Sequence, residues 1–371
     1  MSPVRTEFKL TAPADADKVL VRICLFKALL TTLNKFTTMR KRLLIALLWL
    51  AGSLAAQDFT VPADGSFMDA IRTANSRKDL SHRFVIRVKA GRYLSEGDGD
   101  TIQTVVKGTG GGSDTIRFRS PIATLRAPKV SIIGDGKNQT VIENRPVHEG
   151  ISITSTLYVL NADSTEISDL TLQCNFNNDP TALANRAVAL RERGCKGNRL
   201  KNVRLLSTQD TYYTNAGGDT TLDSCDIHGT VDFICGGGTI RFNHCTLHLE
   251  PRGKTGARDV ICAPATADGE EGFIFQGCTI TGSPEQSGRY HLARPWQKQP
   301  VCLFLNTRME LLPAPAGYCE MHGTIPRLFA EYGSIDQDGN PVDCSERKVV
   351  FKNKAGEDVR VDYSPVLTSE P

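Results

Sequence analysis

Two aspartates near the middle of the chain have the residue type and the spacing of a paired-carboxylate site. Asp210 lies in "QDTYYT", and Asp232 lies 22 residues later in "TVDFI". Two carboxyl groups held close together do not both ionise easily, so one keeps its proton to a higher pH. Such a pair supplies a carboxylate nucleophile or base next to a general acid. Solvated turn aspartates are disfavoured, because a charge without a role inside the apolar "TVDFI" strand costs free energy.

Short β-rich segments, broken by Gly, Asn and Asp, surround both aspartates, and five of them form a repeat. Each segment places a polar or small residue before an apolar one. The apolar positions are separated by 33, 22, 20 and 33 residues: Leu170, Val203, Cys225, Cys245 and Cys278. Repeats near 20 residues, in which no unit buries its own face, stack into a continuous core. We therefore predict an all-β chain that folds as a single-stranded right-handed parallel β-helix.

This repeat predicts that the two aspartates face each other. Asp210 follows Val203 by seven residues, and Asp232 follows Cys225 by the same number. They would therefore occupy the same register on consecutive turns. Adjacent parallel strands lie about 4.8 Å apart, and side chains at equal register point the same way.

The segments that flank the repeat predict a cap and a tail. In "DGSFMDAIRTANS" (64–76) the apolar residues recur with helical spacing, and Asp64 precedes them as an N-cap. This short helix would cover the N-terminal end of the solenoid, whose edge would otherwise be exposed. The sequence becomes polar after Glu331 and ends without a clear element. We assign residues 57–345 to the β-helix domain and residues 346–371 to a C-terminal tail.

The first 56 residues are predicted to be absent from the mature protein. From Met39 the sequence runs through a basic cluster, an apolar run from Leu43 to Leu50, and small residues that end at Ala56. This is the layout of a secretory signal peptide, and it is too short to span a membrane. Residues 1–38 are then an upstream extension or a mis-assigned start. We expect a secreted or periplasmic protein with no membrane attachment after signal cleavage.

Charge and cysteine content argue against nucleic-acid binding and against a zinc site. After residue 56 the chain holds 35 Lys and Arg against 38 Asp and Glu, so no nucleic-acid partner is expected. Cys225, Cys235 and Cys245, with His244 and His248 nearby, match no common zinc spacing. We therefore expect no metal and no cofactor, and cysteines that are core residues or disulfides. Cys225 and Cys245 are one turn apart and in register, which suits a disulfide poorly and predicts two free thiols.

The chain resembles the pectin methylesterases of carbohydrate esterase family 8. The strongest matches are "AVALRERGCKGNRLKNVRLLSTQDTYYT" (187–214), "GTVDFICGG" (229–237) and "ARPW" (293–296), and weaker ones are "AGRYLSE" (90–96), "VSIIGDG" (130–136), "GY" (317–318) and "EYGS" (331–334). They occur in the family's order over most of residues 58–334. The resemblance implies a β-helix of the pectin lyase-like type that hydrolyses methyl esters of galacturonate in pectin.

The resemblance also implies the catalytic roles. Asp232 would be the nucleophile, held by Arg294, while Asp210 would act first as general acid and then as base. Gln209 would donate a hydrogen bond to the oxyanion. The family usually has Gln before "AVAL" as a second oxyanion donor, whereas this chain has Arg186, about one turn before Gln209. Arg186 would stabilise the oxyanion or bind a second carboxylate of a more acidic substrate, or it would lie on the surface.

Three aromatic residues would contact the polysaccharide. Trp296 would stack on a sugar ring, and Tyr213 and Phe233 match aromatic positions that line the family's cleft. The partner would be pectin or a related galacturonate-containing polysaccharide, bound by a monomer. The alternatives are an esterase for another acyl group or an unusual uronate polysaccharide, a polysaccharide lyase, and a non-catalytic carbohydrate-binding protein. The lyase is disfavoured because the sequence shows no carboxylate cluster for calcium.

Overall fold

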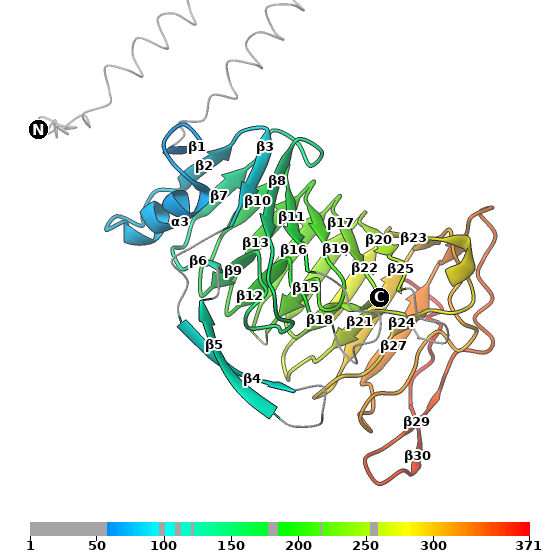
Figure 1. The fold of residues 1–371 in the computed structure, drawn as a ribbon. Coiled ribbons are helices and arrows are strands. Elements are labelled where there is room, and N and C mark those ends of the chain that lie inside the picture. Colours follow the sequence, from blue (N-terminus) through cyan, green and yellow to red (C-terminus); the bar gives the residue numbers. More distant parts are fainter. Residues whose placement is uncertain are drawn as a thin grey trace, which may run out of the picture. The chain divides into compact units, whose positions relative to one another are not determined.

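Three parallel sheets, each with one strand from most turns of the chain, run side by side in the computed structural model (Figure 1). The model describes residues 58–95, 101–107, 113–119, 122–176, 185–215, 217–252 and 259–371, with the backbone alone for 101–107 and 113–119. The predicted signal peptide and residues 1–38 lie outside these ranges. Within them, no helix has the length and apolar character needed to cross a membrane.

The three sheets are all parallel, and each is ordered along the chain. The ten-stranded sheet contains β1 (Phe59–Val61), β2 (Phe84–Val88), β7 (Val130–Ile133), β10 (Glu166–Ser168), β13 (Asn198–Lys201), β16 (Asp219–Asp223), β19 (Thr239–Asn243), β22 (Gly272–Gln276), β25 (Val301–Leu305) and β27 (Leu328–Tyr332). The nine-stranded sheet contains β3 (Gly91–Leu94), β8 (Thr140–Asn144), β11 (Thr171–Cys174), β14 (Arg204–Leu206), β17 (Asp226–Gly229), β20 (Thr246–Leu249), β23 (Thr279–Gly282), β26 (Arg308–Met309) and β28 (Ile335–Asp336). The seven-stranded sheet contains β6 (Ala123–Leu125), β9 (Leu157–Leu160), β12 (Leu190–Arg193), β15 (Tyr212–Thr214), β18 (Val231–Gly236), β21 (Val260–Pro264) and β24 (His291–Ala293). This is a parallel β-helix, as the repeat predicted.

The repeated pattern in the sequence marks one corner of the coil, between the ten-stranded and the nine-stranded sheets. The residue at each corner has a left-handed backbone, with φ between 52° and 60°: Asp169, Asn202, Ser224, His244 and Gly277. Gly and short polar residues tolerate this conformation best, which explains the polar or small residue at the first position of the repeat. The apolar residue that follows each corner is buried. The predicted register is confirmed, because Leu205 lies opposite both Leu172 and Ile227 in neighbouring turns.

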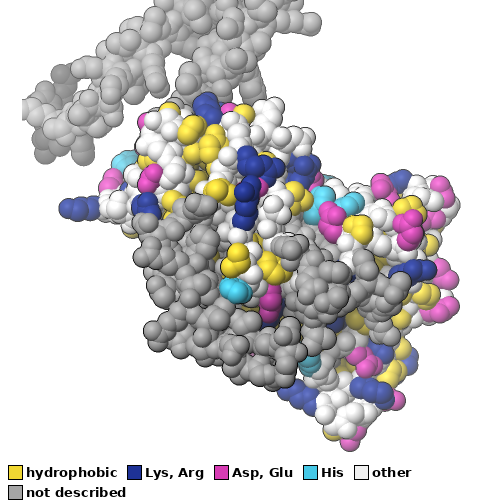
Figure 2. Space-filling model, in the orientation of Figure 1, with side chains coloured by type: hydrophobic (Ala, Val, Ile, Leu, Met, Phe, Trp, Pro, Cys, Tyr) yellow, Lys and Arg dark blue, Asp and Glu magenta, His cyan; other side chains and the backbone are white. Residues whose placement is uncertain are grey.

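The interior of the coil is filled by ladders of like side chains. Phe242, Phe275 and Phe304 stack with ring centroids 4.4 and 4.6 Å apart. Cys225 and Cys245 lie in another ladder as buried free thiols that contact each other, as predicted, and all ten described cysteines are free. On the outside of the coil, Figure 2 shows basic side chains gathered over β3 and β8.

The N-terminal end of the stack is covered by α3 (Phe67–Ser76), which packs on β1, β2 and β6. Its N-cap is Ser66, so the prediction of Asp64 was wrong. The Ser66 hydroxyl accepts from the Asp69 amide at 3.1 Å, and the Asp69 carboxylate accepts from the Ser66 amide at 2.9 Å. Asp64 instead accepts from the Thr60 amide at 2.7 Å and closes the turn after β1. The helix thus begins two residues later than the sequence suggested.

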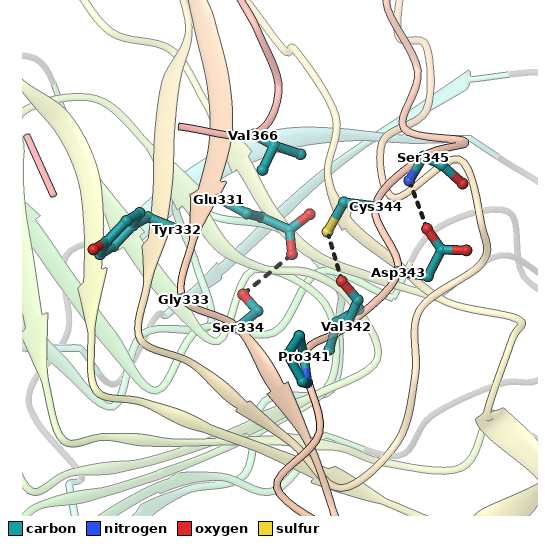
Figure 3. A pocket seen from close by; sticks show the side chains of 10 residues that line it. All are labelled: Glu331, Tyr332, Gly333, Ser334, Pro341, Val342, Asp343, Cys344, Ser345 and Val366. Carbon is teal, nitrogen blue, oxygen red and sulfur yellow. Dashed lines mark hydrogen bonds between the residues drawn. The ribbon is translucent and has the colours of Figure 1, made fainter. Parts of the chain in front are cut away.

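Two antiparallel hairpins and a short helical turn accompany the coil. The hairpins are β4 (Thr101–Lys107) with β5 (Ser113–Arg119) and β29 (Val350–Lys352) with β30 (Asp358–Arg360), and the turn is a 3₁₀ helix at Pro284–Gln286. The second hairpin lies in the segment where the sequence showed no clear element, because strands of three residues are too short to show a period. Near it, residues 331–334 and 341–345 with Val366 line a cavity of about 410 Å³ (Figure 3).

Candidate active site

The two aspartates lie on consecutive turns of the seven-stranded sheet. Tyr212 of β15 is paired with Ile234 of β18, and Asp210 and Asp232 each come two residues earlier. They therefore share a register, as predicted. Their relative exposures are 3% and 2%, and both have left-handed backbones, with φ of 60° and 49°. Asp tolerates this conformation better than most residues, and the corners of the coil use it as well.

Arg294, which directly follows β24, holds Asp232 with two hydrogen bonds. Its Nε donates to Oδ1 of Asp232 at 2.7 Å, and its Nη2 donates to Oδ2. Burial raises the pKa of Asp232, but the hydrogen bonds and the charge of Arg294 oppose this rise. A paired charge-assisted contact of this kind favours the carboxylate form. Asp232 is therefore the member of the pair that ionises first.

Asp210 has the opposite electrostatic setting. Burial and then the charge of Asp232 raise the pKa of Asp210 to about 7, although a hydrogen bond from the Cys235 thiol and the charges of Arg186 and Arg294 lower it in part. Near neutral pH a large share of Asp210 thus carries a proton while its neighbour is ionised. The arrangement offers a nucleophile and an acid in the same place.

Phe233 does not lie where the sequence analysis placed it. A β-bulge between Val231 and Ile234 shifts the register of β18 against β21. Phe233 and Ile234 are both fully buried in the main core, although neighbouring strand residues usually point to opposite faces. The expected role of Phe233 at a sugar is therefore withdrawn. Its side chain packs so closely on Gly229 that a Cβ added there would lie 2.2 Å from the Phe233 Cβ.

Gln209 and Arg186 lie next to each other, one turn apart, beside the acid pair. Their backbones form a parallel bridge. The Gln209 Oε1 accepts from the Asn185 amide at 3.3 Å. The Arg186 guanidinium is engaged by Glu149, with Nε to Oε2 at 2.7 Å and Nη2 to Oε1 at 2.5 Å. Glu149 was missed by sequence reasoning, because it lies 37 residues earlier and no motif marks it.

An aromatic surface continues from the acid pair along the outer face of the same sheet. Tyr213 and Trp296 meet edge to face, with ring centroids 6.1 Å apart. In the preceding turns, the Arg191 guanidinium lies 4.4 Å above the Tyr158 ring and 6.0 Å from the Tyr213 ring. The structure therefore brings together the two predicted aromatics, of which Tyr213 is only 7% exposed, and it adds Tyr158 and Arg191, which carried no sequence signal. Trp296 stays partly exposed.

The pectinesterase family model matches residues 121–358, well over half of the chain and all of the residues above. The chain belongs to the pectinesterase family. It is 27% identical over 315 residues to pectinesterase/pectinesterase inhibitor U1 of Solanum lycopersicum, which covers 80% of this chain and 48% of that protein. It is 31% identical over 219 residues to probable pectinesterase/pectinesterase inhibitor 21 of Arabidopsis thaliana, a match that covers 56% of this chain and 31% of that protein. The chain thus spans about half or less of the length of these relatives.

Solved structures confirm the right-handed parallel β-helix of this family member. A pectin methylesterase from carrot superposes with a TM-score of 0.62 at 20% identity, over 85% of this chain and 90% of that chain. A pectin methylesterase in complex with a hexasaccharide superposes with a TM-score of 0.59 at 22% identity, over 80% of this chain and 93% of that chain. At this level of identity the likeness concerns the fold. The chemistry has to be argued from the residues of this chain.

Proposed function

We propose that this chain is a pectinesterase that hydrolyses the methyl esters of galacturonate in pectin and releases methanol. The observation that carries the proposal is the buried acid pair, in which Arg294 engages Asp232 while the pKa of Asp210 is raised to about 7. Membership of the family and the names of the relatives support the same reaction. No metal or cofactor takes part in the proposed steps.

In the first half of the reaction, the Asp232 carboxylate attacks the ester carbonyl carbon and forms an acyl-enzyme anhydride. Gln209 donates its amide N–H to the developing oxyanion, since its Oε1 already accepts from Asn185. Protonated Asp210 gives its proton to the methoxide oxygen as the carbon–oxygen bond breaks, so methanol leaves as a neutral molecule.

In the second half, water hydrolyses the anhydride. The Asp210 carboxylate takes a proton from water as the hydroxide oxygen attacks the acyl carbon, and the Asp232 carboxylate leaves. Both groups then return to their starting protonation states. Arg294 holds the Asp232 carboxylate in place through both steps, since its two hydrogen bonds fix both oxygens.

Arg186 takes the place of a neutral donor in this scheme. Its charge acts on Asp210, and its side chain remains 42% exposed beside Gln209. Because Glu149 binds two of its nitrogens, the ion pair adds hydrogen-bond donors to the site while offsetting most of the added charge. We propose that Arg186, oriented by Glu149, helps to stabilise the oxyanion or contacts a substrate carboxylate.

The substrate is proposed to lie along the surface of Tyr213 and Trp296, with a sugar ring on Trp296. A solved pectin methylesterase of this fold is a complex with a hexasaccharide, which supports a groove that takes several sugars. We further propose that the protein acts as a monomer, outside the cytoplasm, after removal of residues 39–56.

Methanol release from methylated pectin by the purified chain tests the function. Methanol should appear in step with newly titratable acid, and no absorbance of an unsaturated uronide should develop. Absorbance gain without methanol would replace the proposal with a lyase. Acetate release from acetylated pectin without methanol would indicate the esterase for another acyl group. Binding without either product would indicate a carbohydrate-binding protein.

A further inference from the structure

Two histidines and a glutamate form a cluster on the outer face of the nine-stranded sheet, a different sheet from that of the acid pair. His228 of β17 and His248 of β20 are direct register partners, and their ring centroids are 4.6 Å apart. Glu250 lies two residues after His248, and one ligand atom from each residue lies within 4.8 Å of the others. Figure 2 shows histidine and acidic side chains together on the visible face over β17 and β20.

We infer that His228, His248 and Glu250 bind a divalent transition-metal ion, with zinc the best match. Two imidazoles and one carboxylate are a common zinc ligand set, with bonds of about 2.0–2.2 Å. Tetrahedral bonds of that length place ligand atoms about 3.3 Å apart. Glu250 Oε1 lies 2.8 Å from His228 Nδ1 and 3.9 Å from His248 Nε2, which brackets this value. Small rotations of partly exposed side chains would therefore complete the geometry.

The Thr281 hydroxyl orients the ring of His248 for metal binding. Its Nδ1 lies 2.7 Å from the Thr281 hydroxyl, on the next turn of the coil. When Nδ1 donates to Thr281, Nε2 presents a lone pair on the side of Glu250, whose Oε1 lies within hydrogen-bond distance of His228 Nδ1. A cation bound by all three groups would replace that hydrogen bond. Metal-bound histidines commonly donate their other ring nitrogen to an oxygen in this way.

Three protein ligands would leave one position of a tetrahedral ion to water. Asp226 lies on the same strand and face as His228, but its carboxylate is already paired with Lys137 at 2.9 Å and with Arg204 at 3.1 Å. The three proposed ligands have side-chain exposures of 20–38%, so an ion can enter from solution. A bound ion would join two successive turns, and it would stabilise the folded chain because the cluster exists only there.

Equilibrium dialysis against zinc chloride, with metal counted by mass spectrometry of the untagged mature chain, tests this site. One zinc should bind per chain, and the melting temperature should rise with zinc and fall back with a chelator. His248→Ala and His228→Ala should each lose more than about 100-fold in affinity, and Thr281→Val should lose about 10–100-fold, as other supporting residues of metal sites do.

His82→Ala is the matched control, since His82 is an exposed histidine that contacts Asp79 outside the cluster. It should bind zinc like the wild type. The inference is overturned if the wild type binds no zinc at millimolar concentration, or if His228→Ala and His248→Ala, shown to be folded by circular dichroism, bind it unchanged. Methanol release should not depend on the ion, because the cluster is on a different sheet from the proposed catalytic residues.

Discussion

Asp210 and Asp232 are the same residue type at the same register, yet their surroundings separate their protonation. Arg294 donates two hydrogen bonds to Asp232, whereas the pKa of Asp210 is lowered by a thiol hydrogen bond from Cys235 and by the more distant charges of Arg186 and Arg294. Burial raises the pKa of each carboxyl, and Arg294 opposes this rise through hydrogen bonds and charge at Asp232 but through its charge at Asp210. The division of labour between nucleophile and acid therefore follows from one arginine.

Replacing the proposed nucleophile gives the most direct test at this scale. Asp232→Asn should lower kcat on methylated pectin by on the order of 10⁴ or more, because Asn has the same shape but does not form the anhydride. Methanol release and circular dichroism of the same preparation measure the change. A folded variant with activity within about tenfold of wild type would show that Asp232 is not the nucleophile.

The raised pKa of Asp210 makes a prediction about stability. Its value is about 7 in the folded chain against 3.8 for an ordinary Asp, so its contribution to stability is complete below pH 3.8 and is lost as the pH rises through about 7. Asp210→Asn has no such loss. The variant should gain stability relative to wild type between pH 4 and pH 8, by on the order of 3 kcal/mol. Urea unfolding of both proteins at pH 4 and pH 8 measures their free energies of unfolding. If the difference between variant and wild type is the same at the two pH values, the prediction is contradicted.

Arg186 and Glu149 can be separated by a pair of variants. Arg186→Ala should lose on the order of 10² in kcat, as removal of an oxyanion donor does, and Arg186→Gln should recover part of it. Glu149→Gln keeps the guanidinium of Arg186, so it should lower kcat less than Arg186→Ala does. The comparison separates the role of the arginine from that of the carboxylate that holds it. If Arg186→Ala stays within about threefold of wild type on every methyl-esterified uronate polymer tried, Arg186 is not part of the site.

At the scale of elements, the corners of the coil were predictable and the contacts between turns were only partly so. The repeat revealed the register of Asp210 and Asp232, because a left-handed corner demands a small or polar residue each time. Phe233 could not be placed, since the bulge in β18 that turns it inward leaves no mark in the residue pattern. Glu149 was hidden because its partner Arg186 lies 37 residues away and no motif marks it. His248 was considered for zinc only together with the cysteines, and its register partner His228, 20 residues earlier, was not considered with it.

The cysteine ladder at the corner between the ten-stranded and nine-stranded sheets predicts how its thiols react. Cys225, Cys245 and Cys278 are buried in register on successive turns, and a second pair, Cys262 and Cys302, has its sulfur atoms 3.3 Å apart without a bond. We expect a maleimide reagent to label these thiols only after unfolding, because none is exposed in the fold. Mass spectrometry of tryptic fragments reports both labelling and disulfides. A peptide that joins Cys225 to Cys245 by a disulfide would refute the parallel ladder.

For the molecule as a whole, the C-terminal segment is fastened to the coil by a buried ion pair. The Arg347 Nε lies 2.6 Å from Oε1 of Glu331 in β27, and their side chains are only 2% and 1% exposed. Arg347 also donates to the Pro315 carbonyl at 2.9 Å, and the Glu331 backbone pairs with Val366. Phe351 of the terminal hairpin is fully buried as well. The segment after residue 345 therefore contributes to the fold, beyond what its polar sequence suggested.

Arg347→Met should consequently destabilise the entire coil. The variant leaves the Glu331 carboxylate buried without its cation, which typically costs about 3–5 kcal/mol. The double variant Glu331→Gln with Arg347→Met removes the unpaired charge, so it should recover most of the loss, because a buried ion pair and a neutral pair of similar size are often nearly equal in stability. Urea unfolding of the three proteins, followed by circular dichroism at pH 7, measures the difference. A loss below about 1 kcal/mol for Arg347→Met, or a double variant no more stable than the single one, would show that the C-terminal segment is not held to the coil by this pair.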